Sequence, residues 1–122
     1  MQSSYYQEYY AIEREHWWFL VRNQILMNHL RQNLPFKRPL QILNIGVATG
    51  RTSELLMEFG NVKSVEYDQE CYEFTKANVP IDIVQGSILE LPFESEKYDL
   101  VCAFDVIEHV EDHTLAVSEM KR

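Results

Sequence analysis

The sequence has little cysteine, no cluster of basic residues and no long apolar run, and each absence excludes a class of protein. Its two cysteines, Cys71 and Cys102, form no Cys-x-x-C motif, and no His-rich metal spacing accompanies them. We therefore expect two free thiols in a reducing compartment and no bound metal. No apolar stretch approaches the roughly 18 residues of a membrane span. The first residues, MQSSYYQEYY, have neither the basic nor the apolar segment of a signal peptide. These features predict a cytoplasmic protein with no membrane partner.

The net charge excludes a further class of partner. The chain carries 19 acidic and 11 basic residues, which gives a formal charge of −8, and the basic residues are scattered. Binding to phosphate backbones needs clustered Lys and Arg, so we do not expect nucleic acid as a partner. A small-molecule substrate fits this composition better. The length of 122 residues suits one domain, and no internal repeat or low-complexity segment is present.

Helical and strand patterns alternate along the chain. A helix is expected over residues 4–33, because apolar residues recur about once per turn and no Gly or Pro interrupts them. A linker with two prolines follows. Strands are then expected at 40–45, 62–67, 81–85 and 98–104, and helices at 51–59, 69–78 and from 112 onward. Gly60 is expected to close one helix, Asp68 to cap the next and Pro80 to end it. This alternation predicts an α/β fold with a parallel sheet and helices on both faces.

The most informative segment is LQILNIGVATG, residues 40–50, together with Glu66, which follows twenty residues after Gly46. An apolar strand leads into a loop of small residues that opens into a helix, and the next strand ends on a carboxylate. This is the layout of a nucleoside-binding βαβ unit. Small residues let the backbone approach a ligand, and the carboxylate can accept hydrogen bonds from both ribose hydroxyls. The alternative is an empty turn between a strand and a helix.

The same loop distinguishes between cofactors. A dinucleotide fingerprint has glycines in the pattern G-x-G-x-x-G, which seats a pyrophosphate on a helix N-terminus. Here the small residues are Gly46, Ala48 and Gly50, and Arg51 occupies the last position of the fingerprint. The loop therefore favours a nucleoside whose tail has no pyrophosphate.

Longer motifs make the pattern specific. The segments are LNIGVATG, SVEYD and VQGSILELPFESEKYDLVCAFDVIEHVED, preceded by EREHWWFLVRNQIL. Together they resemble the class I S-adenosylmethionine (SAM)-dependent methyltransferases. The N-terminal stretch EREHWWFLVRNQIL resembles the HWWF-x-x-R lead-in of a bacterial subgroup. The resemblance implies SAM as cofactor and a Rossmann-like sheet with strand order 3-2-1-4. It also implies an N-terminal helical segment, residues 1–38, acting as a lid, and a SAM-binding domain, residues 39–122. The family's last three strands are not in this sequence, so an incomplete version of the fold is expected.

The resemblance assigns roles to the first loop. Asn44 stands where the family usually has Asp or Glu, which holds the cofactor's ammonium group. Asn44 can still accept a hydrogen bond but brings no charge; alternatively, it is a structural turn residue. Gly46, Ala48 and Gly50 are expected to contact the cofactor, with Ala48 replacing a glycine of the family pattern.

Two further groups of residues follow the second and third strands. Glu66 is expected to bind the ribose hydroxyls, and the alternative is a solvated loop acid. Tyr67 is expected to flank the adenine. Gly86 and Ser87 lie where the family often places an Asp that contacts the adenine amine, so serine predicts softer selectivity for adenine.

The end of the fourth strand and the N-terminal segment complete the predicted site. Phe104 and Asp105 are expected beside the cofactor tail or the substrate, because ligands of open α/β sheets bind at the carboxyl ends of strands. His109 is a candidate base toward an acceptor hydroxyl or amine, or it packs against or caps the following helix. Arg22 is expected to pair with the cofactor carboxylate, or it lies on the surface.

Two functions remain open on the sequence. The first is a SAM-dependent methyltransferase, or its cofactor-binding part, acting on a small-molecule acceptor. The second is a non-catalytic, truncated methyltransferase-like protein that works through association. A nicotinamide dehydrogenase is opposed by Arg51 and by the LPF…EHV segment. Because strand four would be an open, apolar edge, we expect a homo-oligomer or a partner chain that covers it.

Overall fold

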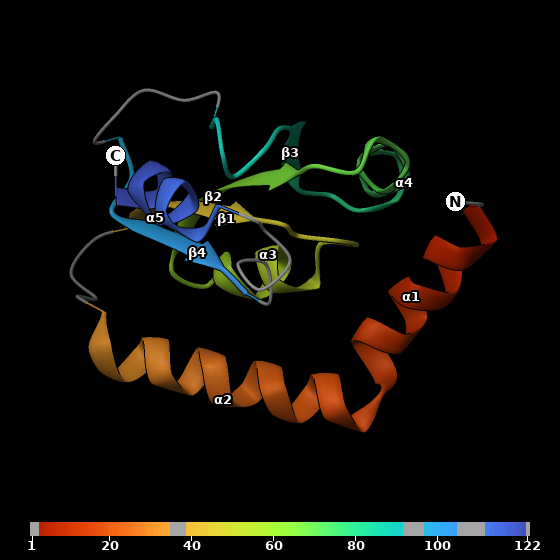
Figure 1. Ribbon diagram of the computed structural model, residues 1–122. Helices are drawn as coiled ribbons and strands as arrows, with labels where there is room; N and C mark the ends of the chain where they lie inside the picture. Colours follow the sequence, from red (N-terminus) through yellow and green to blue (C-terminus); the bar gives the residue numbers. More distant parts are fainter. Residues whose placement is uncertain (1–2, 35–38, 92–96, 105–111, 122) are drawn as a thin grey trace.

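A four-stranded parallel sheet forms the centre of the computed structural model, which describes residues 3–34, 39–91, 97–104 and 112–121 (Figure 1). The strands are β1 (Leu40–Ile45), β2 (Gly60–Glu66), β3 (Asp82–Gln85) and β4 (Leu100–Ala103). They lie in the order β3-β2-β1-β4, and all three pairings are parallel. The predicted strand order is therefore confirmed. The order in which the chain adds strands reverses between β1 and β4, and open α/β sheets bind ligands at such a point.

The side chains of β1 alternate between two hydrophobic cores, one on each face of the sheet. Leu40 and Ile42 pack with Met27 of α2 (Trp17–Asn33) and with Leu56 of α3 (Arg51–Leu56). Leu43 and Ile45 belong to the opposite core, with Ala116 of α5 (His113–Lys121). Figure 1 shows α2 and α3 on one side of the sheet and α5 on the other. The result is a three-layer sandwich with β1 buried at its centre.

The N-terminal segment forms two helices, so the single helix expected over residues 4–33 is wrong. Helix α1 (Ser3–Glu15) ends before His16, whose backbone is extended (φ −71°, ψ 135°), and α2 begins at Trp17. The His16 ring accepts a hydrogen bond from the backbone N–H of Trp18, at 3.2 Å, and so caps α2. The chain bends sharply at this point (Figure 1). The bend carries α1 to the side of α4 (Gln69–Asn78), while α2 runs beneath the sheet.

The boundaries after β1 agree only in part with the sequence patterns. Asp68 caps α4 as predicted, its carboxylate accepting the N–H of Cys71 at 2.9 Å. Gly60 is not a helix C-cap, because α3 already ends at Leu56 and Gly60 begins β2. Its φ is +155°, and a Cβ there would lie 2.2 Å from the carbonyl oxygen of Leu40. Gly60 is therefore required for the close approach of β2 to the start of β1.

Three other findings bear on the sequence-based expectations. Cys71 and Cys102 are buried and free. Among the described residues, no helix combines the length and the apolar character needed to cross a membrane. The same residues contain no group of three or more His, Cys, Asp or Glu side chains placed to hold a metal ion.

Replacing Gly60 by Ala should lower the free energy of unfolding by about 2–3 kcal/mol, since the new Cβ meets backbone atoms that the β1–β2 pairing holds in place. Chemical denaturation of purified protein measures this. Asn61→Ala, at the exposed next position of β2, is the matched control and should change stability by less than about 0.5 kcal/mol. Equal effects of the two variants would contradict this explanation of Gly60.

Candidate functional site

The loop between β1 and α3 adopts a backbone that few residue types tolerate. Gly46, Ala48 and Gly50 have positive φ values of 69°, 51° and 86°. Glycine adopts this region freely, whereas an L-residue with a Cβ is strained by about 1–2 kcal/mol. The spacing of small residues seen in the sequence therefore reflects alternate left-handed positions, and Ala48 is strained.

Hydrogen bonds from two neighbouring elements hold Ala48. One Glu66 oxygen accepts the N–H of Ala48 at 2.9 Å, and the other accepts the N–H of Asp68 at 3.0 Å. The hydroxyl of Thr75, on α4, donates to the Ala48 carbonyl at 2.8 Å. Burial raises the pKa of the Glu66 carboxyl, while the backbone N–H groups that it accepts lower it. Glu66 is thus the predicted carboxylate at the tip of β2, and it joins the loops that follow β1 and β2.

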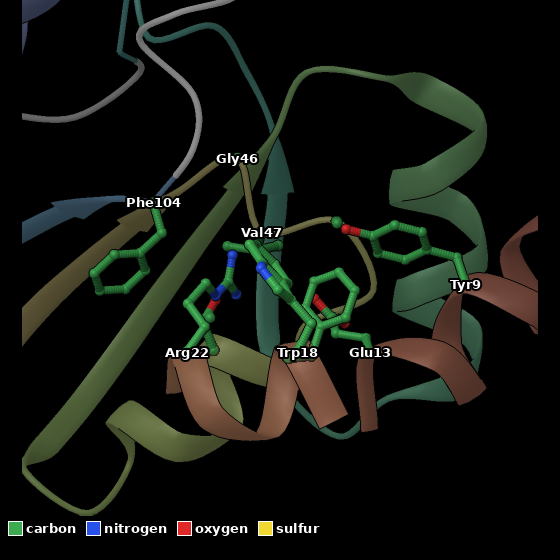
Figure 2. Close-up of a pocket in the computed structure, with 10 residues that line it drawn as sticks. Tyr9, Glu13, Trp18, Arg22, Gly46, Val47 and Phe104 are labelled. Carbon is green, nitrogen blue, oxygen red and sulfur yellow. The ribbon is translucent and has the colours of Figure 1, made fainter. Parts of the chain in front are cut away.

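A cavity of about 340 Å³ lies beside this loop, at the carboxyl ends of β1 and β4 (Figure 2). Phe104 and Tyr9 lie on opposite sides of Val47, and side chains from the N-terminal helices point toward the loop between them. The N-terminal helices contribute half of the lining, and the loop, α3 and the end of β4 contribute the rest. The lining residues are Tyr9, Glu13, Trp18, Phe19, Arg22, Gly46, Val47, Ala48, Thr52 and Phe104.

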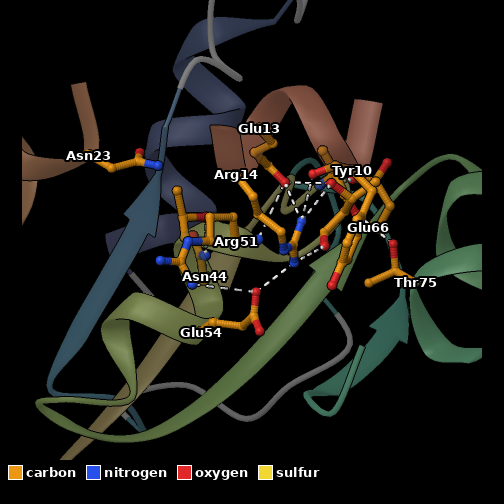
Figure 3. Close-up of polar contacts among 12 residues, drawn as sticks. Tyr10, Glu13, Arg14, Asn23, Asn44, Arg51, Glu54, Glu66 and Thr75 are labelled. Atoms are coloured by element: carbon orange, nitrogen blue, oxygen red, sulfur yellow. Dashed lines mark hydrogen bonds and ion pairs between the residues drawn. The ribbon is translucent and has the colours of Figure 1, made fainter. Parts of the chain in front are cut away.

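The cavity wall includes a carboxylate that the sequence analysis missed. Glu13, on α1, is 3% exposed, and its Oε1 accepts the Thr49 hydroxyl and lies 3.4 Å from the backbone nitrogen of Arg51 (Figure 3). Arg14 lies 3.5 Å from the same oxygen but is 2.5 Å from Glu54 on α3. Burial raises the pKa of the Glu13 carboxyl. A pattern in the sequence points to Glu13: it shares the helix face of Tyr6 and Tyr9, and a lone acid on a buried aromatic face is unusual.

Asn44 lies below the loop and is not among the lining residues of the cavity. It is 1% exposed, and its amide nitrogen donates to the hydroxyls of Thr52 and Ser53, both at 3.0 Å. Ser53 in turn contacts Ser64 of β2 at 2.7 Å. Among the described residues, the Asn44 Oδ1 has no hydrogen-bond partner. The arrangement accounts for Asn44 as a structural residue, and its contact with a cofactor stays a prediction.

The remaining predicted residues lie in the cavity lining, outside the cavity, or outside the described residues. Arg22 and Phe104 line the cavity, and the Arg22 guanidinium lies 5.2 Å from the centre of the Phe19 ring. Tyr67 lies outside the cavity and is 75% exposed.

Gly86 and Ser87 follow β3, next to the end of β2. The N–H of Gly86 donates to the Glu66 carbonyl at 3.1 Å, and the Ser87 hydroxyl accepts the N–H of Leu89. Asp105 and His109 lie outside the described residues, so their predicted roles are unchanged.

Comparison with known proteins identifies the family of this chain. Residues 43–122 match the family model described as "Methyltransferase domain". A probable SAM-dependent methyltransferase of Mycolicibacterium smegmatis is 28% identical over 114 residues, which are 92% of this chain and 43% of that protein. One of Mycobacterium tuberculosis is 26% identical over 113 residues, 91% of this chain and 40% of the relative. The chain thus spans less than half the length of these curated relatives.

Solved structures share the fold at lower identity. A "putative" SAM-dependent methyltransferase from Methanococcus maripaludis superposes with a TM-score of 0.80 at 20% identity, over 99% of this chain and 58% of that one. A complex of the Haloferax volcanii Trm112 methyltransferase activator with a methyltransferase gives a TM-score of 0.73 at 15% identity, over 98% and 54% of the two chains. At these identities the likeness concerns the fold alone.

The left-handed backbone of this loop predicts opposite changes in stability for two substitutions. Ala48→Gly removes a strain of about 1–2 kcal/mol and adds about 0.5–1 kcal/mol of chain entropy on unfolding, so a small net stabilisation is expected. Gly50→Ala should destabilise by about 1–2 kcal/mol, because it adds the same strain and brings a Cβ to 2.8 Å from the Ile81 side chain. Thermal and chemical denaturation of both variants test the pair, and a stabilised Gly50→Ala would contradict it.

Proposed function

Because the chain belongs to the methyltransferase-domain family, we propose that it binds S-adenosylmethionine and forms the cofactor-binding part of a methyltransferase that acts on a small molecule. The observation that carries the proposal is the Glu66 carboxylate, bonded to the left-handed loop at Ala48 beside a cavity. A nucleoside with an amino acid tail requires three parts: an acceptor for the ribose, a loop that allows close approach, and a cavity with charged side chains for the tail.

The side chains present fit this cofactor. Each carboxylate oxygen can accept two hydrogen bonds, so Glu66 can bind ribose hydroxyls while it holds the N–H groups of Ala48 and Asp68. Arg22 would bind the carboxylate of the amino acid tail, and Gly46 lets the backbone approach it. Tyr67, Gly86 and Ser87 follow β2 and β3 and would form the adenine end.

The chemistry follows from the cofactor and from the exclusion of water. The bound sulfonium supplies a methyl group that is already activated for displacement. The protein then has to position the two reactants and remove solvent. Trp18, Phe19 and Phe104 supply apolar walls for this purpose. His109 remains the proposed base toward the acceptor.

Glu66→Gln should weaken binding of SAM and of S-adenosylhomocysteine by about 1–2 kcal/mol, because the ribose hydroxyls lose a charged acceptor. Isothermal titration calorimetry measures both affinities. Glu73→Gln, on the exposed surface of α4, is the control and should leave them unchanged. A thermal melt of each variant checks that the protein is still folded. Unchanged affinity in a folded Glu66→Gln protein would contradict the ribose assignment.

A second proposal concerns association. The two edge strands differ in character: β3 carries Asp82 and Gln85, with Lys63 of β2 paired to Asp82 at 2.8 Å, whereas β4 reads LVCA. Charged side chains protect an edge, and an apolar edge attracts another strand. We infer that β4 is covered by a second copy or by a partner chain.

The chain should therefore not sediment as a 14.5 kDa monomer at micromolar concentration. Two surfaces can mediate the association, the β4 edge and the exposed face of α2. A triple variant of Trp17, Val21 and Ile25 to Gln tests the second surface, since all three side chains are exposed and their replacement leaves both cores intact. Retention of the oligomer in this variant supports the β4 edge as the interface, and its loss would contradict the inference about β4. A monomeric wild-type protein with a cooperative melt would contradict the proposal.

A further inference from the structure

We infer that Glu13 binds the ammonium group of the cofactor's amino acid tail, across the cavity wall from Arg22, which takes the carboxylate. The inference rests on the proposed function and adds a residue and an element to it. A carboxylate from α1 would then supply the negative charge that the Asn44 side chain lacks. The proposal assigns α1 a direct role in choosing an amino acid tail over an uncharged one.

The burial of Glu13 is the first observation. The side chain is 3% exposed, lies on the same helix face as the buried Tyr6, and lines the cavity. Removing a carboxylate from water is unfavourable unless a cation or several hydrogen bonds compensate for it. Burial accordingly raises the pKa of the Glu13 carboxyl.

Most of the described contacts of Glu13 do not require its negative charge, although the charges of Arg14 and Arg22 lower the pKa of its carboxyl. Thr49 and the backbone of Arg51 are neutral donors, and a glutamine would satisfy them equally well. Arg14 lies 3.5 Å from Glu13 but pairs closely with Glu54, at 2.5 Å. Every described contact of the carboxylate is made by Oε1 (Figure 3). A cation in the cavity would compensate for the charge that these contacts leave.

The second observation is the pairing of opposite charges around one cavity. Glu13 comes from α1 and Arg22 from α2, and both point toward the loop at Val47 (Figure 2). An α-amino acid carries one ammonium and one carboxylate group, which matches this pair of side chains. Ala48 lines the same cavity and is bonded to Glu66, so the tail and the ribose would meet at the loop.

Ligands that lack one group at a time test the assignment by calorimetry. The probes are S-adenosylhomocysteine, decarboxylated SAM, which keeps the ammonium, and 5′-methylthioadenosine, which lacks both groups. Glu13→Gln should weaken the first two by roughly tenfold, the usual effect of losing one charge-assisted hydrogen bond, and leave the third within about twofold. Arg22→Gln should weaken only S-adenosylhomocysteine.

Glu15→Gln, at an exposed position of the same helix, is the matched control. Glu15 does not line the cavity, so all three affinities should stay within about twofold. An equal loss of all three ligands in Glu13→Gln would overturn the inference, because it would show that Glu13 only supports the loop. Unchanged affinities would overturn it as well.

A measurement on the wild-type protein keeps the inference testable if Glu13→Gln does not fold. An analogue of S-adenosylhomocysteine with hydrogen in place of the amino group should bind roughly tenfold more weakly than the parent compound. Equal binding of the two would overturn the role of Glu13. If the wild-type protein binds none of the nucleosides, the proposed function itself fails, which is a distinct result.

Discussion

The hydrogen bond between Glu66 and the backbone N–H of Ala48 connects the parts of this molecule that the site depends on. It ties the end of β2 to a loop whose backbone is left-handed at three positions. Thr75 holds the carbonyl of the same residue from α4. With the loop fixed in this way, its outer side can face a cavity, and α3 can begin immediately after it. A strained alanine is tolerated because neighbours on both sides determine its conformation.

Much of the fold follows from local patterns. The apolar run at 40–45 and the acid at Glu66 predicted the central strand, its neighbour and the carboxylate at the tip of β2. The strand order came from a resemblance, and Asp68 was recognisable as a cap because short polar side chains prefer that position. These features depend on residues that are close in sequence, which is why a pattern reveals them.

The features that were missed depend on contacts across the fold. The bend at His16 has no Gly or Pro to mark it, and helical periodicity continues through it. Gly60 is required by the backbone of Leu40, twenty residues earlier, and nothing in the local sequence shows that approach. The contacts of Asn44 with the hydroxyls of Thr52 and Ser53 were likewise not visible in the local sequence. In each case the tertiary neighbours, rather than local preference, decide the role of the residue.

The long-range contacts of α1 have a consequence for the order in which the protein folds. Tyr6 donates to Asp68 at a separation of 62 residues, Glu13 contacts Thr49 across 36, and Arg14 contacts Glu54 across 40. Helix α1 therefore leaves the ribosome before these three partners do. Contacts between distant parts of a chain form late, because the intervening loop must first close. Helix α1 is thus expected to dock after the sheet has formed, and until then its aromatic face is available to chaperones and to other chains.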